Sequence, residues 1–442
     1  MSPNHTYFHK SSGGSGIENP RLTVFSDDWG RHPSSSQHIV RQLAGRWDVT
    51  WVNTIGMRWP GLNREDVQKV ARKLAGWCGM GKKHAGRAGH AGGAARQEEM
   101  VRVCHPVMYP GFRAGWQRRV NRGLIEHAVR QCWSVRGAGG DGGDDVVLTT
   151  LPVCADLVGR LGGRWVYYCV DDFGSWPGVD QGVMREMEAA LVKKVDAVVC
   201  VSETLVQRMI RLGRGDAVLL THGIDVGHWQ GGKKSAGKQG GNEDGLAGDE
   251  RMMRRKQFGW ARDVYGPLYL FWGLIDKRLD VAWVAKLGEA AAREGGRLVL
   301  LGPEQSPAQG LFGKKGVMLG GRMGYEQLPA AAGAADVLVM PYVDEAVTRA
   351  MQPLKLKEYL ATGLPVVCRD LPATRLWADG CDVAGDVDAF VAMAEQRAAV
   401  GATARQLAAR QRLSRESWSE KAKIMEGLLI GSGEVSINGV AA

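Results

Sequence analysis

The stretch Met351–Val367, MQPLKLKEYLATGLPVV, carries the strongest local signals in this 442-residue chain. Pro353 suits the first position of a helix, because the N–H that proline lacks would have no intrahelical partner there. Good helix formers follow, and Gly363 and Pro365 then end the helix before a short apolar strand at 366–368. We therefore expect a helix that leads into a buried strand, a unit typical of α/β folds.

The same helix carries groups that suit a nucleotide-sugar. Its N-terminus, at Pro353 and Leu354, presents free backbone N–H groups and the positive end of the helix dipole to a phosphate. Lys355 lies in the first turn, and Glu358 follows three residues later on the same face. The cation would lie near a diphosphate, and the carboxylate would accept hydrogen bonds from ribose hydroxyls. The alternative is an ordinary solvated Lys–Glu pair on a helix surface.

The ten residues EYLATGLPVV, which begin at Glu358, resemble the nucleotide-binding stretch of GT-B glycosyltransferases in the retaining group called family four or group one. In that family, a Glu before x-x-[AC]-x-G-x-P-V-V binds the donor ribose, and Glu358 occupies this position. The resemblance implies an α/β fold with two Rossmann-like domains, each a doubly wound parallel sheet, that face a central cleft. It also implies transfer of a glycosyl group from a nucleoside-diphosphate sugar.

Other segments extend the resemblance over roughly residues 22–428. Residues 188–202 fit the family pattern E-x7-D-x-V-x3-S. Residues 221–229 resemble the N-G-V-D-x-x-x-F turn that closes the first domain, with His222 in place of the usual Asn.

The segment GLIDKRLD resembles the motif G-x-I-D-x-R-L-D of a family subgroup. By this resemblance, the donor diphosphate would contact Gly273 and the basic pair Lys277 and Arg278. The family loop that packs on the nucleobase corresponds to Arg322 and Met323 here, which are therefore candidates for contact with the base.

One position departs from the family pattern. The family has another Glu eight positions before the ribose ligand, where this chain has Ala350. Either Asp344 or Glu345 in the adjoining loop would supply the carboxylate, or Thr348 and Arg349 would hold the sugar instead. The choice between a retaining and an inverting outcome therefore stays open.

The first half of the chain offers polar side chains at strand ends, where open α/β sheets bind their ligands. The first apolar strand leads into Asp28 and His32, and a later strand that ends at Val170 leads into Asp171 and Asp172. We expect these residues on the acceptor side of the cleft, with Asp28 and His32 as catalytic candidates besides Glu358 and Lys355. A solvated Asp pair beside a serine cap would give the same pattern. No GxGxxG follows the first strand, which argues against an NAD enzyme.

Apolar runs in a βα rhythm predict two sheets and a domain order. The expected strands are 22–26, 48–53, 145–151, 165–170, 197–202 and 217–221 in the first half, and 267–272, 297–302, 336–341 and 366–368 in the second. The expected domain order is a disordered lead-in (1–20), an acceptor-side domain (21–230, with an insertion at about 79–97), a flexible linker (231–256), a nucleotide-sugar domain (257–415), and a C-terminal helix that returns to the first domain with a tail (416–442).

Composition limits the class of protein. Hydrophobic residues make up 44% and charged residues 24%, and no apolar run approaches the ~20 residues of a membrane span, so we expect a cytoplasmic globular protein. The eight cysteines follow neither metal-ligand nor disulfide spacing, so we expect no metal and no cofactor besides the co-substrate. The net charge of +10 fits anionic partners, but no nucleic-acid-binding motif accompanies it.

Aromatic and basic residues alternate before one helical run, at Tyr109, Trp116, Arg118, Arg119 and Arg122. This pattern is compatible with peripheral contact at the inner face of a membrane or with a lipid-linked acceptor. An ordinary solvated basic helix would look the same.

The sequence therefore predicts a hexosyltransferase that moves sugar from a UDP-sugar to a hydroxyl acceptor in polysaccharide or glycolipid synthesis. The resemblance implies retention of configuration and no need for a metal, since cationic groups offset the charge of the leaving diphosphate. Two alternatives are a nucleotide-sugar 2-epimerase of the same fold and a non-catalytic relative that binds nucleotide-sugar or glycan in an assembly complex.

Overall fold

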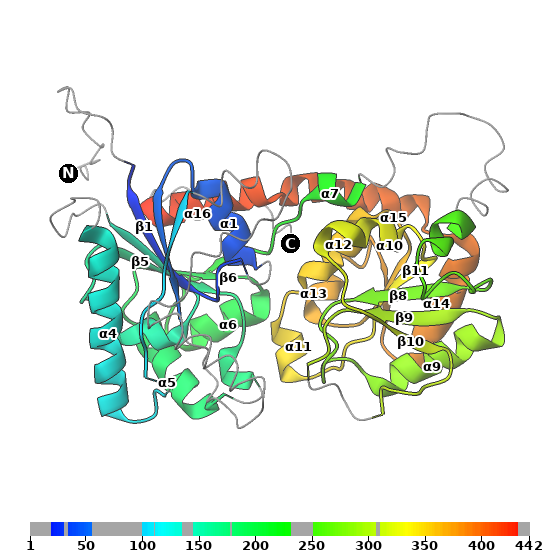
Figure 1. The fold of residues 1–442 in the computed structure, drawn as a ribbon, viewed down its shortest axis with the longest axis horizontal. Helices are drawn as coiled ribbons and strands as arrows, with labels where there is room; N and C mark the ends of the chain where they lie inside the picture. The colour runs from blue at the N-terminus through cyan, green and yellow to red at the C-terminus, as the bar shows by residue number, and fades with distance from the viewer. Residues whose placement is uncertain are drawn as a thin grey trace.

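A computed structural model of the chain describes residues 19–30, 34–54, 100–109, 111–134, 145–176, 179–230, 251–305 and 310–431. Figure 1 shows two α/β domains side by side, each built on its own sheet. His32, most of the predicted lead-in, the 79–97 insertion, residues 231–250 and the C-terminal tail lie outside the described residues.

The first domain contains a seven-stranded sheet whose described strands all pair in parallel. Its strand order is β3-β2-β1-β4-β5-β6-β7, and the order reverses between β1 and β4. The strands are β1 (Arg21–Ser26), β2 (Asp48–Asn53), β3 (Val101–Cys104), β4 (Val146–Thr149), β5 (Arg164–Cys169), β6 (Ala197–Cys200) and β7 (Val218–Leu219). The helices are α1 (Ser35–Leu43), α4 (Gly115–Ser134), η1 (Pro152–Asp156), η2 (Phe173–Ser175), α5 (Gln181–Val192) and α6 (Glu203–Arg211). The next helix, α7 (Val226–Gln230), packs against the core of the second domain through Trp229.

The second domain contains a six-stranded parallel sheet in the order β10-β9-β8-β11-β12-β13, which reverses between β8 and β11. The strands are β8 (Leu268–Trp272), β9 (Arg297–Leu301), β10 (Val317–Gly321), β11 (Val337–Met340), β12 (Val366–Arg369) and β13 (Asp382–Ala384). The helices are α9 (Val281–Arg293), η4 (Tyr325–Gln327), α10 (Leu328–Ala332), α11 (Ala346–Ala350), α12 (Leu354–Ala361), α13 (Pro372–Arg375), α14 (Val387–Val400), α15 (Ala404–Ala409) and η5 (Arg410–Glu416). The last helix, α16 (Trp418–Ile430), packs against the core of the first domain.

The predicted fold class, two doubly wound parallel sheets, is confirmed. Each central strand, β8 in the second domain and β1 in the first, is buried along nearly its whole length. Parallel sheets covered on both faces favour such continuous apolar runs. The point where the strand order reverses, at the carboxyl ends of the strands, is where such sheets bind ligands.

Two chain segments connect the domains and lie side by side. We call them the outgoing crossover, which contains residues 221–224, and the returning crossover, which contains residues 416–417. The N–H of Ile224 on the outgoing crossover donates a hydrogen bond to the carbonyl of Glu416 on the returning crossover, at 2.8 Å. Trp418 then starts α16, which runs back along the first domain (Figure 1), and its ring stacks on His38 at 4.5 Å between centroids. A Cβ on Gly223 would lie 2.6 Å from the Trp418 ring, so glycine is required where the two segments meet.

The sequence analysis missed three strands, β3, β10 and β13. All three are edge strands, and their residues are less buried than those of the central strands. An edge strand has one neighbour and a solvated side, so its sequence lacks the continuous apolar run that marked the others.

The structure also changes the predicted linker and one helix end. Residues 251–256, which the sequence analysis assigned to the linker, are helical. Arg255, one of these residues, is buried and ion-paired to Asp336, which directly precedes β11. The pair therefore holds this helix against the second sheet. Pro353 lies at the N-cap of α12 rather than inside its first turn. In the described part of the chain, no helix combines the length and apolarity needed to cross a bilayer.

Candidate functional site

The predicted donor site lies at the carboxyl end of β8, the central strand of the second sheet. Gly273 follows β8 with a φ of 149°, and a Cβ there would lie 2.1 Å from Cε of Lys355. Gly302 follows the neighbouring β9, and a Cβ there would lie 1.8 Å from the Gly273 carbonyl oxygen. Only glycine allows the two backbones and the lysine side chain to approach so closely. The structure therefore brings Lys355 onto Gly273, as expected for two residues that share one phosphate site.

Helix α12 points its N-terminus at the same place. Its N-cap is Pro353, which has no side chain that can accept a hydrogen bond from the first turn. The free N–H groups at Leu354 and Lys355, the positive helix end and the Lys355 ammonium are together suited to bind an anion.

Glu358 lies one turn further along α12 and is partly buried. Its Oε2 accepts a hydrogen bond from Nε1 of Trp272 at 3.1 Å. Burial raises the pKa of Glu358, although the hydrogen bond from Trp272 and the charges of Lys355 and His228 oppose the shift. Trp272 ends β8, so the strand that provides Gly273 also orients the carboxylate.

Aromatic rings surround this carboxylate. Trp272 packs edge-on against Tyr359 at 4.1 Å and stacks on Trp229 at 5.2 Å. His228 stacks on Tyr325 at 4.3 Å, with the ring planes within 5°. The sequence analysis missed this wall, because its members come from α7, β8, η4 and α12. Trp272, the aromatic residue directly before Gly273, was the sequence signal that could have indicated this wall.

The two basic residues after Gly273 differ in their surroundings. Lys277 is exposed, whereas Arg278 is partly buried and paired with Asp276 at 2.8 Å. Burial alone would lower the pKa of Arg278, but Asp276, Tyr342 and Asp171 raise it. Asp171 belongs to the first domain, so Arg278 meets an opposite charge across the cleft.

The two acidic residues after β5 also differ. Burial raises the pKa of Asp171 to about 6, and the charge of Arg278 opposes the shift. Asp172 is ion-paired with Arg208 of α6, and it accepts a hydrogen bond from Ser175 at 2.6 Å. Asp28 follows β1 and is partly buried, with its carbonyl accepting from Gln37 at 3.3 Å.

The base-contact candidates lie after β10. Arg322 is exposed, whereas Met323 packs against the core of the second domain. Neither side chain forms a polar contact within the described residues that would fix its direction toward the aromatic wall.

A pocket of about 440 Å³ lies in the cleft, between α6 of the first domain and α11 of the second. Its lining combines arginines and carboxylates from both domains: Asp172, Thr204, Leu205, Arg208, Arg211, Asp344, Glu345, Ala346, Arg349 and Ala350. The sequence analysis predicted Asp172 and Arg349 at the cleft but missed Thr204, Arg208 and Arg211.

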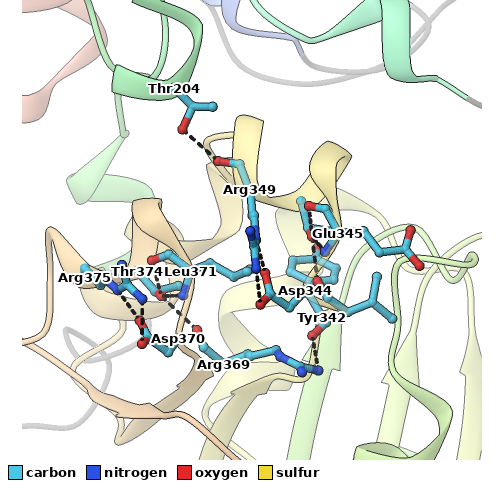
Figure 2. Close-up of polar contacts among 12 residues, drawn as sticks. Thr204, Tyr342, Asp344, Glu345, Arg349, Arg369, Asp370, Leu371, Thr374 and Arg375 are labelled. Carbon is cyan, nitrogen blue, oxygen red and sulfur yellow. Dashed lines mark hydrogen bonds and ion pairs between the residues drawn. The ribbon is translucent and has the colours of Figure 1, made fainter. Parts of the chain in front are cut away.

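Thr348 and Arg349, the predicted sugar contacts, both form local bonds, and Figure 2 shows the ion pair of Arg349. The buried Thr348 hydroxyl donates to the carbonyl of Val343 at 2.6 Å and accepts from the N–H of Glu345, the N-cap of α11, at 3.0 Å. Arg349 forms a two-point ion pair with Asp344, at 2.5 and 2.8 Å. These two side chains therefore stabilise the loop, and their role as sugar ligands stays a prediction.

The same arrangement recurs at the next strand. Residues 344–349 and 370–375 share the pattern D-x-x-x-T-R and follow the neighbouring strands β11 and β12. In the second copy, Arg375 pairs with Asp370 at 2.6 and 2.9 Å, and Thr374 donates to the carbonyl of Arg369 at 2.8 Å (Figure 2). The repeated pattern thus fixes two adjacent loops at the ligand-binding edge of the sheet.

Ala350, where the family has a carboxylate, is 3% exposed and packs in the hydrophobic core of the first domain. Ala350 also borders the cleft pocket, whose lining includes Arg208 and Arg349. Asp344 is used by Arg349, so Glu345 is the remaining candidate that the sequence analysis named. Figure 2 shows its carboxylate directed away from the Asp344–Arg349 pair.

Residues 267–407, from the start of β8 into α15, match the family model described as "Glycosyl transferases group 1". The second domain belongs to this family. The predicted relationship to group 1 glycosyltransferases is thus confirmed. Within the described ranges, no group of His, Cys, Asp and Glu side chains is arranged to hold a metal ion.

A curated relative, "Putative teichuronic acid biosynthesis glycosyltransferase TuaH" of Bacillus subtilis, is 25% identical over 199 residues. The match spans 43% of this chain and 45% of the relative, so it covers less than half of either protein.

Solved structures of the GT-B fold match nearly the whole chain. Sucrose-phosphate synthase of Thermosynechococcus elongatus has a TM-score of 0.61 at 14% identity, covering 93% of this chain and 98% of the other. HepE of Anabaena, in complex with UDP and glucose, has a TM-score of 0.58 at 10% identity, covering 93% and 99%. A trehalose-6-phosphate protein of E. coli, bound with UDP-2-fluoro glucose, has a TM-score of 0.58 at 12% identity, covering 93% and 99%. At these identities the similarity shows the fold, which is GT-B.

Proposed function

We propose that this protein transfers a glycosyl group from a UDP-sugar to a hydroxyl of a saccharide or lipid-linked acceptor. The observation that carries the proposal is the meeting of Lys355, Gly273 and Glu358 at the carboxyl end of β8, inside a group 1 domain. The Lys355 ammonium and the N-terminus of α12 bind the diphosphate, and the Glu358 carboxylate binds the ribose.

Uridine is the proposed base and a hexose the proposed sugar. The support comes from HepE, which is described in complex with UDP and glucose, and from the E. coli structure with UDP-2-fluoro glucose. The Bacillus relative is named for teichuronic acid biosynthesis, which supports an acceptor in polysaccharide synthesis.

The chemical step is cleavage of the bond between the sugar and the diphosphate. Negative charge develops on the leaving diphosphate, and preorganised donors that stabilise this charge lower the barrier. Lys355, the free N–H groups of α12 and the cationic pair Lys277 and Arg278 supply that stabilisation, so we propose a metal-independent reaction. Retention of configuration is the outcome implied by the family resemblance.

Glu345 is proposed as the carboxylate that faces the donor sugar. It lines the cleft pocket together with Ala350, and its own carboxylate has no partner among the described residues. Asp171, with its raised pKa and its position across the cleft from Arg278, is the proposed acceptor-side group, together with Asp28 and Asp172.

A non-catalytic nucleotide-sugar-binding protein is the second candidate, because Ala350 cannot act as a carboxylate. Radiolabelled UDP-hexoses tested with saccharide and lipid-linked acceptors decide between the two. Label transferred to an acceptor supports the transferase, whereas binding without transfer to any acceptor supports the binding protein. UDP release without an acceptor, together with a change in the sugar, would indicate a 2-epimerase.

Peripheral contact with the inner face of a membrane is also proposed, through α4. Its outward face exposes Trp116, Val120 and Leu124, at 54%, 42% and 37%, each one turn from the next. Arg119 is exposed between them and forms no ion pair in the described residues. A surface helix normally turns polar residues outward, so an apolar stripe flanked by arginine fits an anionic lipid surface.

A further inference from the structure

The loop before the donor helix is held by the other domain. Ser202, at the start of α6, donates to the carbonyl of Ala350 at 2.6 Å. Thr204 donates to the carbonyl of Arg349 at 3.1 Å, as Figure 2 shows. The backbone N–H of His222 donates to Oε1 of Gln352 at 2.7 Å. The segment between β11 and α12 therefore takes its position from the first domain and the outgoing crossover.

The donor helix itself is tied to both crossovers through one buried side chain. Lys357 is 3% exposed, and its ammonium donates to Oγ1 of Thr221 at 3.2 Å and to the carbonyl of His222 on the outgoing crossover. Its third bond is an ion pair with Glu416 on the returning crossover. All three donors of the ammonium are thus used, two by one crossover and one by the other.

Glu416 does not depend on Lys357 alone. Lys421 of α16 contacts the same carboxylate oxygen at 2.7 Å and also donates to Thr221 at 3.1 Å. Burial lowers the pKa of Lys357 to about 8, although the charge of Glu416 opposes the shift. An ion pair buried in this way adds little net stability, but its directional bonds fix how the helix lies against its neighbours.

Lys355 and Lys357 point to opposite sides of α12, because residues two apart on a helix differ by about 200°. Lys355 covers Gly273 at the donor site, and Lys357 reaches the crossovers. The helix has eight residues and is therefore about 12 Å long, so one short element connects the candidate donor site to the place where the two crossovers meet.

We propose that the segment Arg349–Lys357 couples the relative position of the two domains to the donor site, with Ser202 and Lys357 as the positioning residues. Movement of the first domain displaces the segment at the Ala350 carbonyl, and movement of the crossovers turns α12 at Lys357. Donor binding at the N-terminus of α12 therefore favours the closed arrangement of the domains. Loss of the bonds made by Ser202 or Lys357 lowers donor affinity. The proposal rests on the proposed function in taking UDP as the ligand.

The first test replaces Lys357 by methionine, which keeps the length of the chain and leaves Glu416 its bond to Lys421. The matched control is Lys423→Met. Lys423 is an exposed lysine of α16, two residues after Lys421. Small-angle X-ray scattering measures the radius of gyration with and without saturating UDP, and calorimetry measures the Kd for UDP.

We expect Lys357→Met to enlarge the radius of gyration of the free protein, to lose the compaction that UDP causes in the wild type, and to raise the Kd about 5–10-fold. Lys423→Met should match the wild type. A merely structural role would lower the unfolding temperature without changing the response to UDP.

The second test separates two roles of Ser202, which also caps α6 by accepting from the N–H of Leu205 at 3.3 Å. Ser202→Asp keeps an acceptor for this cap but has no proton for the Ala350 carbonyl, whereas Ser202→Thr keeps both bonds. We expect the Asp variant to lose UDP-dependent compaction and the Thr variant to retain it.

The proposal is overturned if Lys357→Met and Ser202→Asp both keep the wild-type radius of gyration in the free protein and with UDP. If the wild type does not bind UDP, the proposed function fails. The radii of gyration of the wild type and the two variants without UDP then still decide whether Lys357 and Ser202 fix the position of the domains.

Discussion

Gly273 shows how one missing side chain shapes the donor site. The residue has a φ of 149°, and its absent Cβ leaves the space that Lys355 occupies. The carbonyl of Gly273 also lies where a side chain on Gly302 would be. The position thus combines two requirements, a backbone conformation that other residues avoid and room for a lysine.

Gly273→Ala should displace the Lys355 ammonium and weaken UDP binding about tenfold or more, with a loss of about 1–3 kcal/mol in stability from backbone strain. Gly213→Ala is the matched control, because Gly213 has a φ of 93° but no atom near its would-be Cβ. Calorimetry with UDP and thermal unfolding measure both effects. Equal UDP affinity in the two variants would remove Lys355 from the site.

Asp171 predicts a dependence of stability on pH. Its folded-state pKa is raised to about 6 from 3.8, so its stabilising contribution is complete at low pH and is lost as the pH rises through 6. Asp171→Asn should therefore be more stable than the wild type at pH 7.5, by about 1–3 kcal/mol, and similar to it near pH 4. Unfolding measured at both pH values checks this.

Asp172→Asn gives the contrast, since that change breaks an ion pair with Arg208. It should lower stability at pH 7.5. A destabilised Asp171→Asn at that pH would mean that its carboxylate is paired more strongly than its surroundings indicate.

Local sequence predicted Lys355, Glu358 and Gly273 because each belongs to a short motif. It did not predict Trp272, Lys357 or Ser202. Their partners are Glu358, Glu416 and Ala350, which lie 86, 59 and 148 residues away. Nothing in the spacing of a single segment indicates bonds of this kind.

At the scale of elements, α4 has two apolar sides. One side buries Ile125, Val129 and Trp133 against the sheet, and the other exposes the stripe that begins at Trp116. The second apolar side has no covering element within the described residues, which is why we connect it with a lipid surface.

Trp116→Glu should reduce binding to phosphatidylglycerol vesicles about tenfold, because it removes an apolar contact and adds repulsion from anionic lipid. Leu407→Glu on α15 is the control, since Leu407 is also exposed but lies in the other domain. Sedimentation with vesicles measures bound protein. Unchanged binding of the Trp116 variant, or no binding by the wild type, would contradict the membrane role of α4.

Most strands that the sequence predicted are central and buried, although the partly buried edge strand β7 was predicted as well. Strand β2 agrees with its expected residues 48–53, and β8 differs from its expected residues by one. The edge strands β3, β10 and β13 were missed because partial exposure weakens their apolar pattern. The 344–349 and 370–375 repeat was visible in the sequence, but its meaning depended on knowing that β11 and β12 are neighbours.

At the scale of the whole molecule, two similar sheets are joined by two adjacent crossovers and by α16. The family resemblance predicted this plan, and the strand order in each sheet confirms it. The plan places α12 beside the crossovers, where Lys357 contacts both of them. The coupling that we propose between donor binding and domain position depends on this arrangement.

The most direct test of the donor site is calorimetric titration of UDP into the wild type and Glu358→Gln, with Glu420→Gln as a distant control. A hydrogen bond to a charged group contributes about 1.5–3 kcal/mol, so we predict a Kd about 10–100-fold weaker in Glu358→Gln, with the unfolding temperature kept and the control unchanged. Equal UDP affinity in the wild type and Glu358→Gln would contradict the assignment of the nucleotide to this helix.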